Sequence, residues 1–231
     1  MVLQTNLFLQ TNLKGESEEY QAKREELRLA EIELMRQRER VAAMRRAMPR
    51  GATVEDYIFE EGPQDLGAGD EPVRQVRLSE LFSAPDRPLV IYHLMYGKKQ
   101  TSPCPMWIDG YNGIAHHLKQ NVDVAIAAAA DPPALRAHAR ARGWNRLRLL
   151  SCGTNTFKRD LKSEDAEGRQ ESTISVFTRD DGSVRHFYTA HPSMAEDIRE
   201  RGIDLLTPVY NMLDLTPQGR GEWYASLKYS G

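Results

Sequence analysis

The residue best placed to do chemistry is Cys104, one of two cysteines in a chain of 231 residues. It follows the apolar run 89–95 and a polar loop, and it precedes a segment of helical spacing that begins at Pro105. Parallel α/β sheets present their reactive groups where a strand ends and a helix begins. A helix N-terminus and nearby cations stabilise a thiolate and lower its pKa. We therefore expect a reactive thiol at Cys104, with Lys98 and Lys99 adding positive charge.

Thr101 stands three residues before Cys104, where a CxxC redox motif has its first, attacking cysteine. A chain with only the second cysteine cannot complete a dithiol cycle at one site. The same TxxC spacing is that of peroxiredoxins, in which Thr101 would hydrogen-bond a thiolate or a peroxide. The arginine that such a site needs stays open among Arg148, Arg179 and Arg185. The alternative is that Cys104 is a small buried apolar residue without chemistry.

Cys152 is the other cysteine and a candidate resolving thiol. It follows the third strand of the predicted β-α-β-α-β unit, so it could lie at the same sheet edge as Cys104. Whether the two thiols approach one another depends on the fold. A pairing is one outcome, and an isolated Cys152 is the other.

The histidines give no metal site. His116 and His117 lie near Asp109, but adjacent residues of a helix point about 100° apart and do not share a face. His93 lies inside the best strand, where we expect an interior histidine with its hydrogen bonds satisfied. The sequence contains no HExxH, paired CxxC, GxGxxG or P-loop pattern. We therefore predict neither a metal nor a cofactor.

The elements that must position Cys104 alternate between strand and helix. Their periodicity and punctuation predict a β-α-β-α-β unit followed by a β-hairpin. The predicted strands are 89–95, 122–128, 147–150, 173–179 and 184–189, and the predicted helices are 105–120, 132–142 and 194–201. This order predicts an α/β fold with a mixed sheet flanked by helices, which is the order of a thioredoxin-like domain.

A long helix is predicted over residues 17–48, with Ser17 as its N-cap and Pro49 and Gly51 as stop signals. Its apolar stripe consists of Leu27, Ile32, Leu34, Met35 and Val41. A helix of this length lies across a domain or pairs with a partner, so a homodimer through it is expected. The predicted division is an N-terminal tail and helix, 1–50, and a thioredoxin-like domain with a C-terminal extension, 51–231.

The composition excludes several classes of function. The 31 basic and 33 acidic residues give a net charge of -2, which argues against a nucleic-acid partner. The longest apolar stretches, such as 122–130, are much shorter than the roughly 20 residues that span a bilayer, so no membrane partner is expected. Two cysteines and no signal-peptide pattern predict a cytoplasmic protein.

Longer motifs carry a family resemblance. They include YHLMYG from Tyr92, MWIDGYNGIAHHL from Met106, ISVFTRDDGSVRHFY from Ile174 and DLLTPVYNMLDLTPQGRGEWY from Asp204. With these motifs the chain resembles, over nearly its whole length, a bacterial family of uncharacterised proteins described as predicted dithiol-disulfide oxidoreductases. The family is similar to thioredoxins and peroxiredoxins.

The resemblance implies a thioredoxin-like fold and a site around the CxxC position. Typical members carry CxxC followed by two residues and a tryptophan, so Trp107 aligns Cys104 with the second cysteine and Thr101 with the first. The implied substrate pocket contains Pro103, Trp107 and Tyr111. The expected function is thiol-disulfide oxidoreductase or one-cysteine peroxidase chemistry at Cys104, with a disulfide or peroxide as substrate and an external thiol as reductant. The alternative is a redox-inactive binding or scaffold module.

Overall fold

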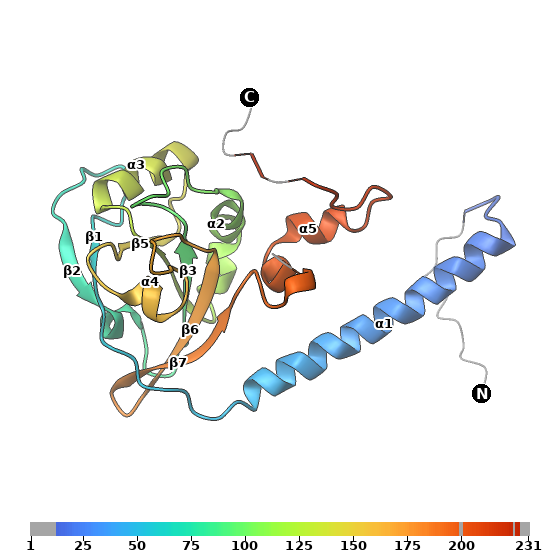
Figure 1. Ribbon diagram of the computed structural model, residues 1–231, viewed down its shortest axis with the longest axis horizontal. Coiled ribbons are helices and arrows are strands. Elements are labelled where there is room, and N and C mark those ends of the chain that lie inside the picture. The colour runs from blue at the N-terminus through green and yellow to red at the C-terminus, as the bar shows by residue number, and fades with distance from the viewer. Residues whose placement is uncertain (1–12, 199–200, 224, 227–231) are drawn as a thin grey trace. The chain divides into compact units, whose positions relative to one another are not determined.

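The computed structural model of the chain describes residues 13–198, 201–223 and 225–226. The chain divides into two compact units, of which the first ends at Pro49 and the second begins at Arg50 (Figure 1). The N-terminal tail of the sequence analysis, residues 1–12, lies outside the described residues. The division of the chain at residue 50 stays a prediction about domains.

The first unit contains the long helix α1, Glu18–Arg46. Ser17 is its N-cap, and the Ser17 hydroxyl accepts a hydrogen bond of 3.1 Å from the backbone N–H of Tyr20. Arg45 and Arg46 occupy the last turn, where cations interact favourably with the helix dipole. The predicted long helix is therefore present, and none of its described residues is buried.

The second unit is built on one mixed sheet of seven strands in the order β2-β1-β5-β4-β3-β6-β7. The strands are β1 Ile58–Glu61, β2 Arg74–Arg77, β3 Leu89–Leu94, β4 Asp123–Ala128, β5 Arg148–Ser151, β6 Thr173–Asp180 and β7 Ser183–Ala190. The central strands β3, β4 and β5 are parallel, and the other pairings are antiparallel. The β6–β7 hairpin turns at Asp181 and Gly182, which both have positive φ angles, as a tight hairpin turn requires.

Short connections place the helices between these strands. The helices are α2 Met106–Leu118, α3 Pro132–Arg142, α4 Phe157–Asp160 and α5 Pro208–Leu213, with 3-10 turns at Leu78–Leu81, Glu196–Ile198 and Arg201–Leu206. The order β3-α2-β4-α3-β5 followed by the β6–β7 hairpin confirms the predicted thioredoxin-like fold. The helix predicted at 194–201 is instead two 3-10 turns, and residues 199–200 between them lie outside the described residues.

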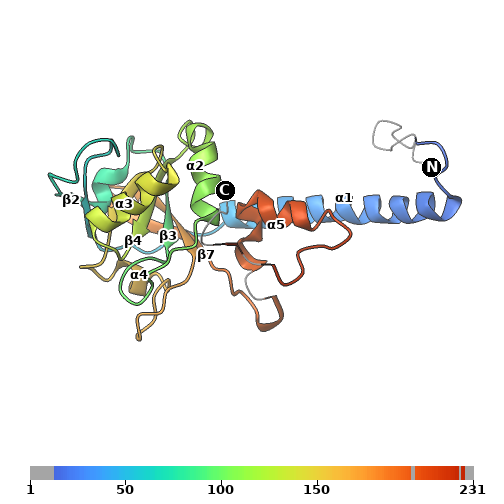
Figure 2. The same ribbon diagram turned by 90° about the horizontal axis from the view of Figure 1, so that it is seen from above.

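Two cores lie on the two faces of the sheet, because successive side chains of a strand point to opposite faces. Tyr92 and Ile126 pack with the apolar sides of α2, α3 and α5 in one core, and α5 lies beside α2 in both views (Figure 2). Ile91 and Ala127 pack on the other face with Phe157 of α4. The sheet therefore separates two groups of side chains that are close in sequence.

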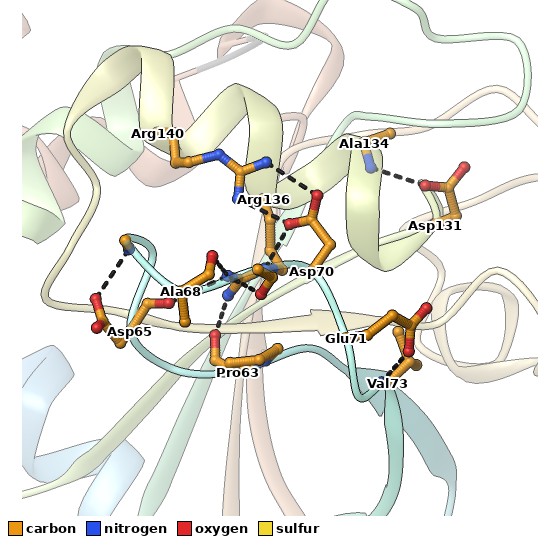
Figure 3. Close-up of polar contacts among 12 residues, drawn as sticks. Pro63, Asp65, Ala68, Asp70, Glu71, Val73, Asp131, Ala134, Arg136 and Arg140 are labelled. Carbon is orange, nitrogen blue, oxygen red and sulfur yellow. Dashed lines mark hydrogen bonds and ion pairs between the residues drawn. The ribbon is translucent and has the colours of Figure 1, made fainter.

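A buried arginine holds the loop between β1 and β2 onto α3 (Figure 3). Arg136 donates to the carbonyl oxygen of Pro63 and, at 3.1–3.2 Å, to three further carbonyls of residues 65–69. Its Nε lies 2.9 Å from a carboxylate oxygen of Asp70, and Arg140 binds the same carboxylate at 2.7 Å. These two guanidinium groups lower the pKa of Asp70 to about 2. The hydrogen bonds of Arg136 compensate for the burial of its charge.

Candidate functional site

The loop of residues 95–105 connects β3 to α2 and carries the TxxC segment. It turns at Gly97, whose N–H and C=O are both hydrogen-bonded to Gln100 at 2.8–3.0 Å. Gly97 has a φ of +94°, and a Cβ atom there would lie 2.1 Å from the backbone nitrogen of Ala130. Only glycine fits this approach to the end of β4, so the turn determines how the chain reaches Cys104.

Cys104 is half-buried, two residues before the start of α2. Its pKa is raised, chiefly because burial disfavours the thiolate. The backbone N–H of Met106 and the charge of Arg142 act in the opposite direction, and the carboxylate of Asp109 raises the pKa further. The expectation of a lowered pKa at this helix start is therefore wrong. The helix start does act on the thiol, but desolvation is the larger effect.

The two lysines before Cys104 are bound elsewhere, which corrects the expectation that they activate the thiol. Lys98 forms an ion pair with Glu164 at 2.7 Å, and Lys99 donates to the backbone carbonyl of Glu167. Both interactions hold the loop to residues 164–167, which follow α4 in the chain.

An arginine that the sequence analysis missed acts on Cys104. Arg142, at the end of α3, lowers the pKa of the thiol and donates to Asp109 Oδ2 at 2.8 Å. Trp144 Nε1 donates to the other carboxylate oxygen of Asp109 at 2.7 Å. The order of elements could have pointed to Arg142. In a β-α-β-α-β unit with parallel strands, α2 and the end of α3 are expected to lie side by side, which brings position 142 beside position 109.

The three arginines considered from the sequence lie at other contacts. Arg148 binds both carboxylate oxygens of Glu61 at 2.8–3.0 Å, and Arg185 donates to the carbonyl of Gly51 at 3.2 Å. Arg179 lies over the ring of Phe82, 6.0 Å from its centroid. These partners give each of the three side chains a structural role.

Thr101 and Pro103 differ in their surroundings. The Thr101 side chain is exposed, whereas Pro103 is buried next to Cys104 in the chain. Among the described residues, Thr101 makes no hydrogen bond with Cys104. A role of Thr101 at the thiol would therefore require the loop to change conformation or a substrate to bridge the two groups.

Cys104 packs against a buried core cluster that contains several aromatic side chains. Trp107 is 6 % exposed and Tyr111 is 7 % exposed, so both are core residues. The ring of Tyr111 packs edge-on against Tyr92 with centroids 5.4 Å apart, and Trp107 packs edge-on against Tyr210 at 6.1 Å. Tyr92 belongs to the same buried cluster, against which Cys104 packs. The structure thus brings together Cys104 and four aromatic residues.

Two hydroxyl groups within this aromatic group differ in their hydrogen bonding. Tyr92 donates to Ser172 Oγ at 3.1 Å. The hydroxyl of Tyr111 is buried and has no hydrogen-bond partner within the described part of the chain. Burial raises the pKa of both tyrosines, so both hydroxyls are protonated donors at neutral pH.

Cys152 belongs to the core on the opposite face of the sheet from the cluster against which Cys104 packs. Its thiol is 2 % exposed and donates to the carbonyl of Ala128 at 3.2 Å. Burial raises its pKa to about 11. The sheet lies between the two sulfur atoms, and both cysteines are free thiols. The structure therefore does not bring the candidate resolving cysteine to Cys104.

A family model described as a bacterial protein of unknown function, DUF899, matches residues 10–230. The chain belongs to the DUF899 family. At this level the resemblance seen in the sequence is confirmed. No curated protein matches the chain.

Solved structures similar to this DUF899 chain have low sequence identity to it. Reduced Prx3 from Vibrio vulnificus in complex with hydrogen peroxide is 19% identical, with 69% of this chain and 96% of that chain covered and a TM-score of 0.45. AhpC of Mycobacterium bovis is 15% identical, with 77% and 98% covered and a TM-score of 0.48. A putative thioredoxin reductase from Burkholderia cenocepacia is 19% identical, with 69% and 96% covered and a TM-score of 0.47.

The DUF899 chain also holds a chain of hydrogen bonds around His93, which is fully buried as predicted. Ser163 Oγ donates to the carbonyl of Lys158 at 3.1 Å, so it accepts from Nδ1–H of His93 at 2.7 Å. The other ring nitrogen of His93 therefore accepts from Ser175 Oγ at 2.9 Å. Ser175 in turn accepts from Thr189 at 2.9 Å. These hydrogen bonds determine the tautomer of His93, in which Nδ1 carries the proton.

Two further properties of the DUF899 chain concern metals and membranes. Within residues 13–198, 201–223 and 225–226, no three histidine, cysteine or acidic side chains are grouped as a metal ion requires. None of the described helices is long and apolar enough to cross a membrane.

Proposed function

We propose that this chain is a thioredoxin-like thiol redox protein in which Cys104 is the single reacting thiol. The observation that carries the proposal is the position of Cys104, which is half-buried in the loop between β3 and α2, two residues before the start of α2. At this position the backbone N–H of Met106 and the charge of Arg142 both favour the thiolate form. Cys104 is also the less buried of the two thiols.

With a disulfide substrate, Cys104 loses its proton and its sulfur attacks one substrate sulfur. An S–S bond then joins Cys104 to that half of the substrate, and the other half leaves as a thiol. An external thiol attacks the mixed disulfide, regenerates Cys104 and carries away the second half as a new disulfide. Because Thr101 replaces the attacking cysteine and Cys152 lies on the opposite face, this cycle uses no second protein cysteine.

With a peroxide substrate, the thiolate attacks one peroxide oxygen and becomes a sulfenic acid, while the other oxygen leaves in an alcohol or water. Two external thiols then reduce the sulfenic acid to the thiol, releasing water and a disulfide. In this reaction we propose that Thr101 reaches the peroxide rather than the resting sulfur, because its side chain is exposed.

A redox-inactive binding module is the second candidate. The raised pKa of Cys104 favours it, because little thiolate is present at neutral pH. On this proposal Cys104, Trp107 and Tyr111 are packing residues, and the partner surface lies elsewhere, on α1 or the C-terminal extension.

The proposed partners follow from these two candidates. The redox reaction would use a disulfide or peroxide as substrate and an external thiol as reductant. The helix α1 would bind a second copy of the chain. Both cysteines are free thiols, which supports the proposal that the protein works in a reducing compartment such as the cytoplasm. We also propose that residues 51–231 fold as the thioredoxin-like domain and 1–50 as an attached segment.

The decisive experiment is the pH dependence of Cys104 alkylation in native protein with Cys152→Ser as background. The redox proposal expects a single titration with a midpoint above the ordinary pKa of a cysteine thiol, and a mixed disulfide with oxidised glutathione in mass spectrometry. Cys104→Ser in the same background is the control and should give neither signal. Alkylation that occurs only after unfolding would overturn the redox proposal in favour of the binding module.

A further inference from the structure

The helix α1 has an apolar stripe with a seven-residue period. Tyr20, Leu27, Leu34 and Val41 are each seven residues apart. Tyr20, Leu27 and Leu34 are 54 %, 58 % and 54 % exposed. A straight helix places residues seven apart almost one above the other, so these side chains form one seam along the helix. Met44 extends the same seam by one turn.

An apolar seam on a helix without buried residues needs an occupant, because monomeric proteins seldom expose contiguous apolar surface. A seven-residue repeat over three intervals is typical of a helix that pairs with another helix. Polar and charged residues predominate on the other faces of α1, where Leu29, Ile32 and Met35 are the large apolar side chains outside the seam, and this suits a two-helix arrangement rather than burial in a larger core.

The charges of α1 are unequally distributed along its length. Residues 18–33 contain six acidic and three basic residues, which gives a net charge of about -3. Residues 34–46 contain five arginines and one glutamate, a net charge of about +4. Two parallel copies of this helix would place halves with the same sign of net charge beside each other. Two antiparallel copies place the acidic half of each beside the basic half of the other, so the helix is complementary to its own reverse.

We propose that α1 pairs in an antiparallel manner with α1 of a second copy of the chain. The inference rests on the proposed homodimer and adds its geometry. A two-fold axis near Met35 places Leu27 opposite Met44 of the other copy. The same axis brings Glu31 and Glu33 of one helix beside Arg38 and Arg40 of the other. The interface is isologous, so every contact occurs twice.

The first experiment measures self-association by analytical ultracentrifugation at several protein concentrations. The double variant Leu27→Glu and Leu34→Glu should dissociate at least about tenfold more readily, because charges replace the centre of the seam. Leu29→Glu is the matched control: Leu29 is 48 % exposed but lies on the opposite side of α1 from Leu27, so its self-association should equal that of the wild type. A wild-type protein that is monomeric at all concentrations would overturn both the homodimer and its geometry.

The second experiment determines the direction of pairing. Leu34→Cys and Leu27→Cys are each placed in a chain with Cys104→Ser and Cys152→Ser, and folding is checked by circular dichroism. The antiparallel pair predicts an interchain disulfide at Leu34→Cys, near the two-fold axis, and none at Leu27→Cys, which is far from its copy. Equal cross-linking at both positions would mean a parallel pair, which overturns the inference while the homodimer stands.

Discussion

The pKa of Cys104 depends on its burial and on two charged neighbours. Burial raises the pKa of the thiol most strongly, Asp109 adds to the increase, and Arg142 opposes it. Asp109 and Arg142 also form an ion pair of 2.8 Å with each other. The thiol is therefore influenced by an ion pair whose two charges have opposite effects on its pKa. Removal of one charge should shift the pKa of Cys104 in a definite direction.

Asp109→Asn should lower the pKa of Cys104. The variant removes a negative charge that disfavours the thiolate, keeps the positive charge of Arg142, and leaves an oxygen that can accept from Trp144. The midpoint of alkylation against pH, measured with Cys152→Ser as background, should move to lower pH. Glu167→Gln, at an exposed position, serves as control and should leave the midpoint unchanged. A midpoint that rises in Asp109→Asn would contradict the proposed electrostatics.

Ser163→Ala should destabilise the fold by about 1–3 kcal/mol, because it leaves the buried Nδ1–H of His93 without an acceptor. The free energy of unfolding can be measured by urea denaturation. Ser102→Ala removes an exposed hydroxyl and should change the stability by less than about 0.5 kcal/mol. Equal effects of the two substitutions on the free energy of unfolding would show that the hydrogen bond between His93 and Ser163 does not contribute to stability.

Acid should destabilise the fold through His93. Burial holds the pKa of this histidine well below its usual range, and the positive charge of Lys158 acts in the same direction. The unfolded chain therefore binds a proton below about pH 6.5 that the folded chain does not bind, and stability falls as the pH falls through this range. The urea midpoint should be lower at pH 5.5 than at pH 7.5. His93→Gln, which cannot titrate, should show a smaller difference.

At the scale of elements, long side chains hold loops to the helices and strands that position the site. Lys98 and Lys99 bind the segment after α4, and Arg136 of α3 binds the loop between β1 and β2. In both cases a cationic side chain holds a loop that lacks the regular backbone hydrogen bonds of a helix or a sheet. The burial of each cation decides how much such a contact contributes.

Arg136→Met should destabilise the fold by on the order of 3 kcal/mol, because it removes the hydrogen bonds that a buried guanidinium group donates to the carbonyl oxygens of the loop. Arg140→Met is the matched control on the same helix: Arg140 binds the same Asp70 but is 37 % exposed. Its loss should cost no more than about 1 kcal/mol. Amide exchange of residues 62–73 should accelerate in Arg136→Met only. Similar losses in both variants would mean that the Asp70 contact dominates rather than the carbonyls.

At the scale of the whole thioredoxin-like unit, the sheet separates two chemical environments. Cys104 packs against the face covered by α2 and α3, whereas Cys152, His93 and Phe157 are on the face covered by α4. Each face has its own core, so a reaction at Cys104 has no direct access to the second thiol.

Oxidation of the native protein should therefore give no disulfide between Cys104 and Cys152. We expect that diamide treatment, followed by proteolysis and mass spectrometry, finds Cys104 modified by added glutathione and Cys152 still reduced. Protein oxidised in urea is the control, because the unfolded chain permits the internal disulfide. An internal disulfide formed rapidly under native conditions would contradict the separation by the sheet.

The sequence by itself determined those features that depend on local periodicity and punctuation. The run 89–95 predicts the central strand, Gly143 ends α3 with a φ of 70°, and the Asp181-Gly182 turn predicts the last hairpin. These signals arise within a few residues, so no knowledge of distant contacts is needed. The position of Cys104 between β3 and α2 follows from the same local signals.

Only the tertiary structure decided the environment of the thiols. The pKa of Cys104 depends on how deeply the loop is buried and on Arg142, which is 38 residues away in sequence and belongs to another helix. The face on which Cys152 lies depends on strand register, because a shift of one residue reverses the face of every side chain. Burial and register are properties of distant segments packed together, so the local pattern around each cysteine could not contain them.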